Sequence, residues 1–64
     1  MVIDRNKLDC ILINVGMSRQ ELATKAGVAL STVLAASRRP AKIETLHKII
    51  SALGVKAEDI MKEG

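Results

Sequence analysis

The chain has 64 residues, a formal net charge of +3, one cysteine, and no Phe, Tyr or Trp. A chain of this length forms a single domain, residues 1–64, which buries only about 60% of its unfolded surface and so favours short, tightly packed helices. The missing aromatic residues exclude single-strand nucleic-acid binders that stack bases on aromatic rings, and the lone cysteine excludes a disulfide framework.

The first predicted helix covers Arg5–Val15. Its apolar residues recur at the spacing of one helix face: Leu8, Ile11, Leu12 and Val15. Asp4 is expected to be the N-cap, with Ile3 and Leu8 at the two positions of a hydrophobic staple. Gly16 fits the left-handed position that ends a helix.

The next segment carries the strongest local signal in the sequence. Ser18 and Glu21 form an S-x-x-E capping box, which predicts a second helix over Arg19–Ala26 that ends at Gly27. A third helix is predicted over residues 30–37. A helix, a tight turn with glycine and a second helix make up the helix-turn-helix arrangement.

A basic loop and two further helices are predicted in the rest of the chain. The loop consists of Arg38, Arg39, Pro40, Ala41 and Lys42. The fourth helix has an apolar stripe of Leu46, Ile49, Ile50 and Leu53, and it ends at Gly54. A last short helix is predicted over residues 57–62, with Ile60 and Met61 as its apolar residues; Ile60 is expected in the core, and a dimer contact is the alternative. The sequence therefore predicts an all-α fold, a compact bundle of four to five short helices with a central helix-turn-helix.

In order and spacing, these segments resemble the Cro and phage-repressor type of helix-turn-helix domain, whose fold is lambda-repressor-like. The segments that carry the resemblance are residues 16–23, 27–28, 31–33, 45–49 and 52–55, and the likeness extends over residues 4–63. It implies a transcriptional regulator of phage or mobile-element type, a repressor that binds double-stranded DNA with a sequence preference. It also implies a homodimer, at least on DNA.

The resemblance implies three groups of DNA-contacting residues. The positions that face the major groove on the third helix are Ala29, Leu30, Ser31, Thr32, Leu34 and Ala35. The positions near the DNA phosphates at the start of the second helix are Ser18, Arg19 and Gln20, where a helix N-terminus favours an anion. The basic loop adds Arg38, Arg39 and Lys42 on the other side.

The third helix departs from the family pattern. Leu30 stands where the family often has a glutamine that reads a base pair, and leucine offers a base only an apolar contact with a thymine methyl. Ala29 lacks the usual capping hydroxyl, which costs about 1 kcal/mol. Since only Ser31 and Thr32 can hydrogen-bond, we expect a modest base readout by these two residues and Leu30.

Several residues have more than one interpretation. Arg19 lies in the first turn of its helix, where a cation is unfavourable; we interpret it as a phosphate contact, with compensation by Glu21 as the alternative. Leu30 and Leu34 are expected on the outer face, to contact thymine methyls, a protein partner or a neighbouring helix. Ile13 lies off the apolar stripe and is a candidate dimer contact.

A second hypothesis follows from the apolar outer face formed by Ala29, Leu30, Leu34 and Ala35. On the same fold, this face suits a protein-interaction module such as an antitoxin or an adaptor. An enzyme is not expected, nor a metal or small-molecule cofactor, because His47 has no companion ligands and no catalytic group of residues is visible. Cys10 is expected to be half-buried. With no membrane-spanning run or signal peptide, we expect a cytoplasmic protein.

Overall fold

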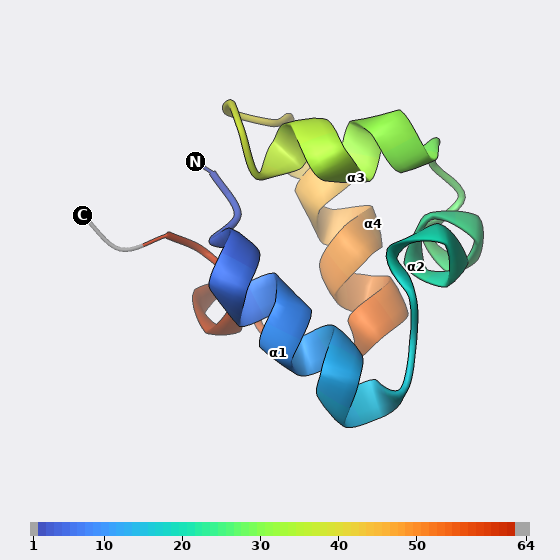
Figure 1. Ribbon diagram of the computed structural model, residues 1–64. Coiled ribbons are helices and arrows are strands. Elements are labelled where there is room, and N and C mark those ends of the chain that lie inside the picture. The colour runs from blue at the N-terminus through green and yellow to red at the C-terminus, as the bar shows by residue number, and fades with distance from the viewer. Residues whose placement is uncertain (1, 63–64) are drawn as a thin grey trace.

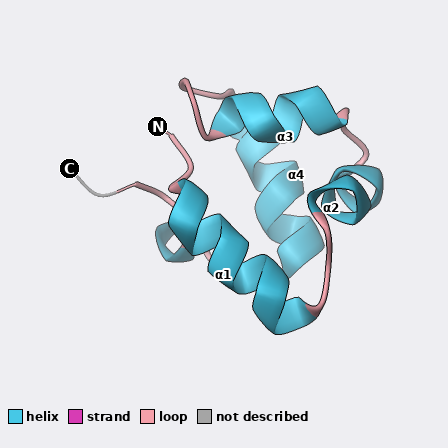
Figure 2. Cartoon of the chain, in the orientation of Figure 1, coloured by secondary structure: helices cyan, strands magenta, loops and turns pink. Residues whose placement is uncertain are grey.

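The computed structural model describes residues 2–62 as four α-helices and one turn of 3₁₀-helix, joined by loops (Figure 2). The elements are α1 (Arg5–Val15), α2 (Arg19–Ala26), α3 (Leu30–Ala36), α4 (Ile43–Leu53) and the 3₁₀ turn η1 (Ala57–Asp59). The predicted all-α class and central helix-turn-helix are confirmed. The predicted last helix over residues 57–62 is wrong, since only its first three residues are helical.

The first two helices begin where local capping predicts. The Asp4 carboxylate accepts hydrogen bonds from the backbone N–H groups of Asn6 and Lys7, at 2.9 and 3.2 Å. Ser18 and Glu21 form the reciprocal capping box at the start of α2. These bonds satisfy N–H groups that have no partner within a helix, so both starts are fixed by residues adjacent in sequence.

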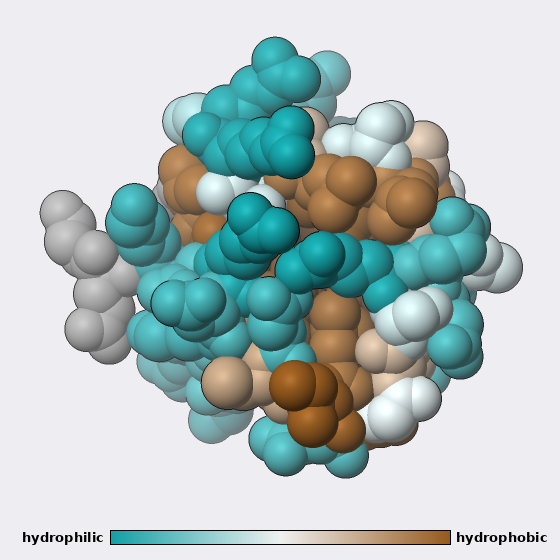
Figure 3. Space-filling model, viewed as in Figure 1, coloured by the Kyte–Doolittle hydropathy of each residue, from teal (hydrophilic) through white to brown (hydrophobic). Residues whose placement is uncertain are grey.

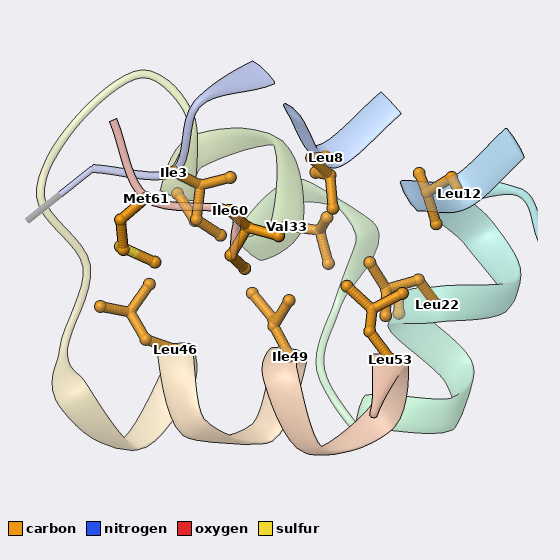
Figure 4. Close-up of a cluster of buried hydrophobic side chains, with 12 residues drawn as sticks. Ile3, Leu8, Leu12, Leu22, Val33, Leu46, Ile49, Leu53, Ile60 and Met61 are labelled. Carbon is orange, nitrogen blue, oxygen red and sulfur yellow. The ribbon is translucent and has the colours of Figure 1, made fainter. Parts of the chain in front are cut away.

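The helices surround α4. In Figure 1, α1 crosses the front of the molecule, α3 lies at the top and α2 at the right, with α4 behind them in the centre. α4 packs against α2 and η1, and α2 packs against α3. The three buried residues of α4 point toward side chains from the other elements (Figure 4).

The core consists of aliphatic and methionine side chains, as the composition requires. Its buried members are Ile3, Leu8, Leu12, Leu22, Ala23, Val33, Ala36, Leu46, Ile49, Leu53, Ile60 and Met61. No polar or charged residue is buried in the part of the chain that the structure describes. The expected core role of Ile60 is therefore confirmed, and Met61 belongs to the same core.

Two residues of α1 are more exposed than the sequence indicates. Val15, on the predicted apolar stripe, is 48% exposed, because α1 ends there and the chain turns back. The N–H of Met17 donates to the carbonyl of Leu12, at 2.9 Å, and the Met17 side chain packs on the core. Cys10 is exposed rather than half-buried, because it lies on the side of α1 away from Leu8 and Leu12.

Segments near the two ends of the chain pair with each other and with α3. Ile3 and Met61 form an isolated antiparallel bridge, and the N–H of Lys62 donates to the carbonyl of Val2, at 2.9 Å. The N–H of Ile3 also donates to the carbonyl of Ala36, the last residue of α3, at 2.9 Å. This pairing explains why residues 60–62 leave the helical conformation, and it ties down the C-terminal end of α3.

Candidate nucleic-acid interface

The turn between α2 and α3 depends on one glycine. Gly27 adopts a left-handed conformation, with φ of 75°, which other residues adopt only at a cost. Its N–H donates to the carbonyl of Thr24, at 3.2 Å, and the N–H of Val28 donates to the carbonyl of Ala23, at 3.0 Å. The last turn of α2 is thereby closed, and the chain changes direction within three residues to begin α3.

Small and branched side chains hold α3 against the rest of the domain. Ala23 is buried in α2, so that α3 can approach it closely, and Val28 packs on the core at the corner between the two helices. Val33 and Ala36 are the buried residues of α3. The helix is therefore fixed along one face, and its opposite face is directed away from the core.

The structure separates the two leucines of α3. Leu30 is half-buried and packs against the core, which agrees with the neighbouring-helix alternative for this residue. Leu34 is also half-buried, but it lies outside the core cluster and lines a surface hollow with Ser31 and Ala35. Ala29 is exposed, and its side chain provides no cap for α3.

Two shallow hollows lie along the outward face of α3, each of about 450 Å³. The first is lined by Ser31, Leu34, Ala35, Arg38 and Arg39. The second shares Ser31, Ala35 and Arg39 with the first, and adds Thr32, Lys42 and Thr45 among others. Small apolar surface, hydroxyl groups and cationic side chains thus border the same concave region. Thr45 was not among the predicted contacts, although it belongs to a segment that carries the family resemblance.

The basic loop is tied back onto the end of α3. The N–H groups of Arg38 and Arg39 both donate to the carbonyl of Ala35, at 3.0 Å each. The hydroxyl of Ser37 donates to the carbonyl of Leu34, at 2.8 Å. These bonds fix the backbone of Arg38 and Arg39 beside the outward face of α3.

The cationic side chains of this loop are free to meet an anion. Arg38, Arg39 and Lys42 are exposed, and within residues 2–62 their side chains form no ion pair. In Figure 3, hydrophilic atoms project from the α3–α4 connection at the top of the view, next to the brown and white surface of α3. Unpaired cations beside a concave helix face suit a polyanion.

The start of α2 offers a second, more constrained set of polar groups. The Ser18 hydroxyl oxygen accepts from the N–H of Glu21, at 3.1 Å, and the N–H of Ser18 donates to the Glu21 carboxylate, at 3.3 Å. Gln20 is exposed, and its amide lies 3.5 Å from the hydroxyl of Thr24. Both Ser18 and Gln20 are therefore at the surface, but they already take part in bonds within α2.

Arg19 has a partner that sequence reasoning missed. Its guanidinium donates to the carboxylate of Asp9 on α1, forming an ion pair. The negative charge that offsets this cation at the helix N-terminus comes from α1, whereas the sequence predicts a phosphate or Glu21 as its source. No local pattern links the two residues, because they lie on different helices.

Comparison with known proteins agrees with the fold and the site: the chain is a helix-turn-helix domain of a DNA-binding class. A family model described as the Cro/C1-type HTH DNA-binding domain matches residues 7–62, and the chain belongs to that family. None of the curated proteins compared with the chain matched it.

Two kinds of feature, a metal-binding cluster and a membrane-spanning helix, are absent from the described residues. No group of three or more histidine, cysteine or carboxylate side chains among them is placed to hold a metal ion, and His47 is exposed on α4. None of the helices in that part of the chain has the length and apolar character needed to cross a bilayer.

Proposed function

We propose that this chain is a transcriptional regulator that binds duplex DNA with a sequence preference by inserting α3 into the major groove. The observation that carries the proposal is the position of Arg38, Arg39 and Lys42, exposed and unpaired beside the outward face of α3. In helix-turn-helix domains this helix meets base edges while neighbouring residues hold the phosphates. Membership of the Cro/C1-type family supports the same assignment.

The proposed contacts fall into two sets. Those to phosphates involve Ser18, Arg19, Gln20, Arg38, Arg39 and Lys42, and those in the groove involve Ala29, Leu30, Ser31, Thr32, Leu34 and Ala35. A domain bound across a promoter prevents transcription by occupancy alone, so we propose that the protein is a repressor of phage or mobile-element type. We also propose that it acts in the cytoplasm as a non-enzymatic binder without a small-molecule cofactor, since contacts to phosphates and bases need neither.

We further propose that two copies bind a palindromic site as a symmetric dimer. Ile43, at the start of α4, is 81% exposed. It borders an apolar hollow of about 260 Å³ that is also lined by Leu46, His47, Ile50, Ala57 and Met61. A projecting side chain beside an apolar hollow is self-complementary, because each copy can insert its isoleucine into the hollow of the other. Ile13, the candidate from the sequence, is 78% exposed and does not line this apolar hollow.

The first test is a salt titration of binding to duplex DNA from upstream of the protein's own gene, compared with unrelated duplex DNA. If each domain neutralises about four phosphates, affinity falls roughly 100-fold between about 50 and about 200 mM salt. We expect this steep dependence on both DNAs, with tighter binding to the upstream one. Equal weak binding to both, or none, would contradict the proposal.

One observation favours a second candidate, a protein-interaction module. The outward face of α3 carries Leu34 and Ala35, and its only hydroxyl groups are those of Ser31 and Thr32. Two charge-introducing variants separate the candidates. A DNA binder loses most of its affinity with Arg38→Glu, whereas an adaptor tolerates that change and loses its partner with Leu34→Glu.

A further inference from the structure

The outward face of α3 is formed by residues at helical spacing. Leu34 and Ala35 follow Ser31 by three and four positions, so these three residues lie on one side of the helix, and Arg38 follows just beyond its end. All four line the same hollow. Val33 and Ala36, on the opposite side, are buried. This face is therefore the part of α3 that meets a duplex placed against the hollow.

The side chains of α3 exclude most forms of direct base readout. Guanine is usually read by Arg or Lys, adenine by Asn or Gln, and cytosine by a carboxylate. The helix sequence, LSTVLAA, contains none of these residue types. Arg38 follows the end of α3, and its cationic side chain is assigned to a phosphate in the proposed function. The base feature left for an apolar surface to recognise is the 5-methyl group of thymine, which projects into the major groove.

We propose that the outward face of α3 selects thymine through contacts of Leu34 and Ala35 with thymine methyls. The inference rests on the proposed function and names what that site reads. The sequence offers this role to Leu30 and, as one of several alternatives, to Leu34, but Leu30 packs against the core, while Leu34 and Ala35 line the hollow. The small side chain of Ala35 lets a base edge come close, and the Leu34 side chain provides the apolar contact.

Charge complementarity favours DNA as the occupant of this apolar surface. Arg38 and Arg39 border the hollow that Leu34 and Ala35 line, and both arginines are exposed and unpaired within residues 2–62. A phosphate backbone held by these two cations brings the adjacent groove against the apolar face. In this arrangement the cations supply affinity and the methyl contacts supply the sequence preference.

The experiment begins with selection of tight-binding duplexes from a random library by the full chain. Each thymine in the stretch of duplex that the bound protein covers, the protected site, is then replaced by deoxyuridine, which removes only the methyl group. We expect the selected sites to contain thymines, and affinity to fall about fourfold for each contacted methyl removed, the equivalent of burying one methyl-sized group. Deoxyuridine placed outside the protected site is the control and leaves affinity unchanged.

Two variants connect the effect to α3. Leu34→Ala should weaken binding to the thymine site severalfold and reduce the effect of deoxyuridine, because only the contact of Ala35 remains. Lys42→Gln should weaken binding to thymine and deoxyuridine duplexes by the same factor, because it removes only a phosphate contact. Urea unfolding of each variant verifies that the fold is retained.

The outcomes distinguish this inference from the function on which it rests. If no duplex is enriched and binding does not depend on salt, the proposed function fails and the inference fails with it. If specific sites are enriched but deoxyuridine has no effect, the protein remains a DNA-binding regulator and the thymine readout is overturned. Unchanged deoxyuridine sensitivity in Leu34→Ala also overturns it, because the methyl contact then lies elsewhere.

Discussion

The guanidinium of Arg19 is held in an ion pair by Asp9. Their ion pair joins α1 to α2, and the side chains are 40% and 32% exposed, respectively. A pair this exposed contributes only about 0.2–1 kcal/mol to the free energy of unfolding. It also lies at the N-terminus of α2, where the helix dipole disfavours a cation. A DNA phosphate and Asp9 therefore compete for the same guanidinium.

We predict that Asp9→Asn makes DNA binding tighter and more salt-dependent. Without its carboxylate partner, Arg19 is available to a phosphate, so the slope of log affinity against log salt should steepen by about 0.9. The free energy of unfolding should fall by no more than about 1 kcal/mol. Salt titrations and urea unfolding measure the two effects. Arg19→Gln is the matched control, because it removes the same ion pair but should leave the slope shallow. An unchanged slope in Asp9→Asn would contradict the competition between Asp9 and a phosphate for Arg19.

Among the four α-helices of residues 2–62, α3 alone begins with neither a side-chain cap nor an acidic residue in its first turn. Ala29 occupies its N-cap position with extended backbone angles, φ of −72° and ψ of 150°, and provides no side-chain cap. The N–H groups of Thr32 and Val33 donate only to the carbonyl of Ala29, at 3.0 and 3.3 Å. The N-terminal turn that would enter the DNA groove is therefore stabilised mainly by Leu30 packing on the core.

We predict that Ala29→Ser raises the free energy of unfolding by about 1 kcal/mol, because the backbone at this position already suits a capping hydroxyl. For a domain of this size, that gain raises the melting temperature by about 4–8 °C. Ala29→Val, which adds bulk without a hydroxyl, should give no gain. Thermal unfolding measures the melting temperatures of the two variants. Equal values would mean that the N–H groups at the start of α3 are already satisfied by other groups.

Local signals explain which elements the sequence predicts well. Asp4, and Ser18 with Glu21, act through backbone groups within three residues, so the starts of α1 and α2 follow from the pattern. The last predicted helix failed because Met61 pairs with Ile3 from the other end of the chain. The residues of the candidate site also fall into those predicted from local spacing and those that depend on tertiary contacts. The basic loop and the outward position of Leu34 follow from spacing, whereas the packing of Leu30 and the Asp9–Arg19 pair depend on tertiary contacts.

At the scale of the whole molecule, the two most exposed isoleucines lead to opposite predictions about dimer formation. Ile13 and Ile43 are 78% and 81% exposed, so replacing either has little effect on the core. Only Ile43 borders the apolar hollow between α4 and η1. In a two-fold dimer the Ile43 contact occurs twice, because one isoleucine from each copy is buried, and burying one is worth about 2 kcal/mol.

We therefore predict that Ile43→Ser weakens dimer formation roughly a thousandfold, since two symmetry-related contacts are lost. The variant should still bind a single half-site with the affinity of the original chain, because α3 and the basic loop are unchanged. On a full palindromic site it should bind the two halves independently, where the original chain binds them cooperatively. Binding isotherms on half and full sites, with sedimentation equilibrium of the free protein, measure these effects. Ile13→Ser is the control of equal exposure and should keep the cooperativity. If Ile13→Ser abolished cooperativity and Ile43→Ser kept it, the dimer face would lie on α1, which carries the candidate contact Ile13 predicted from the sequence.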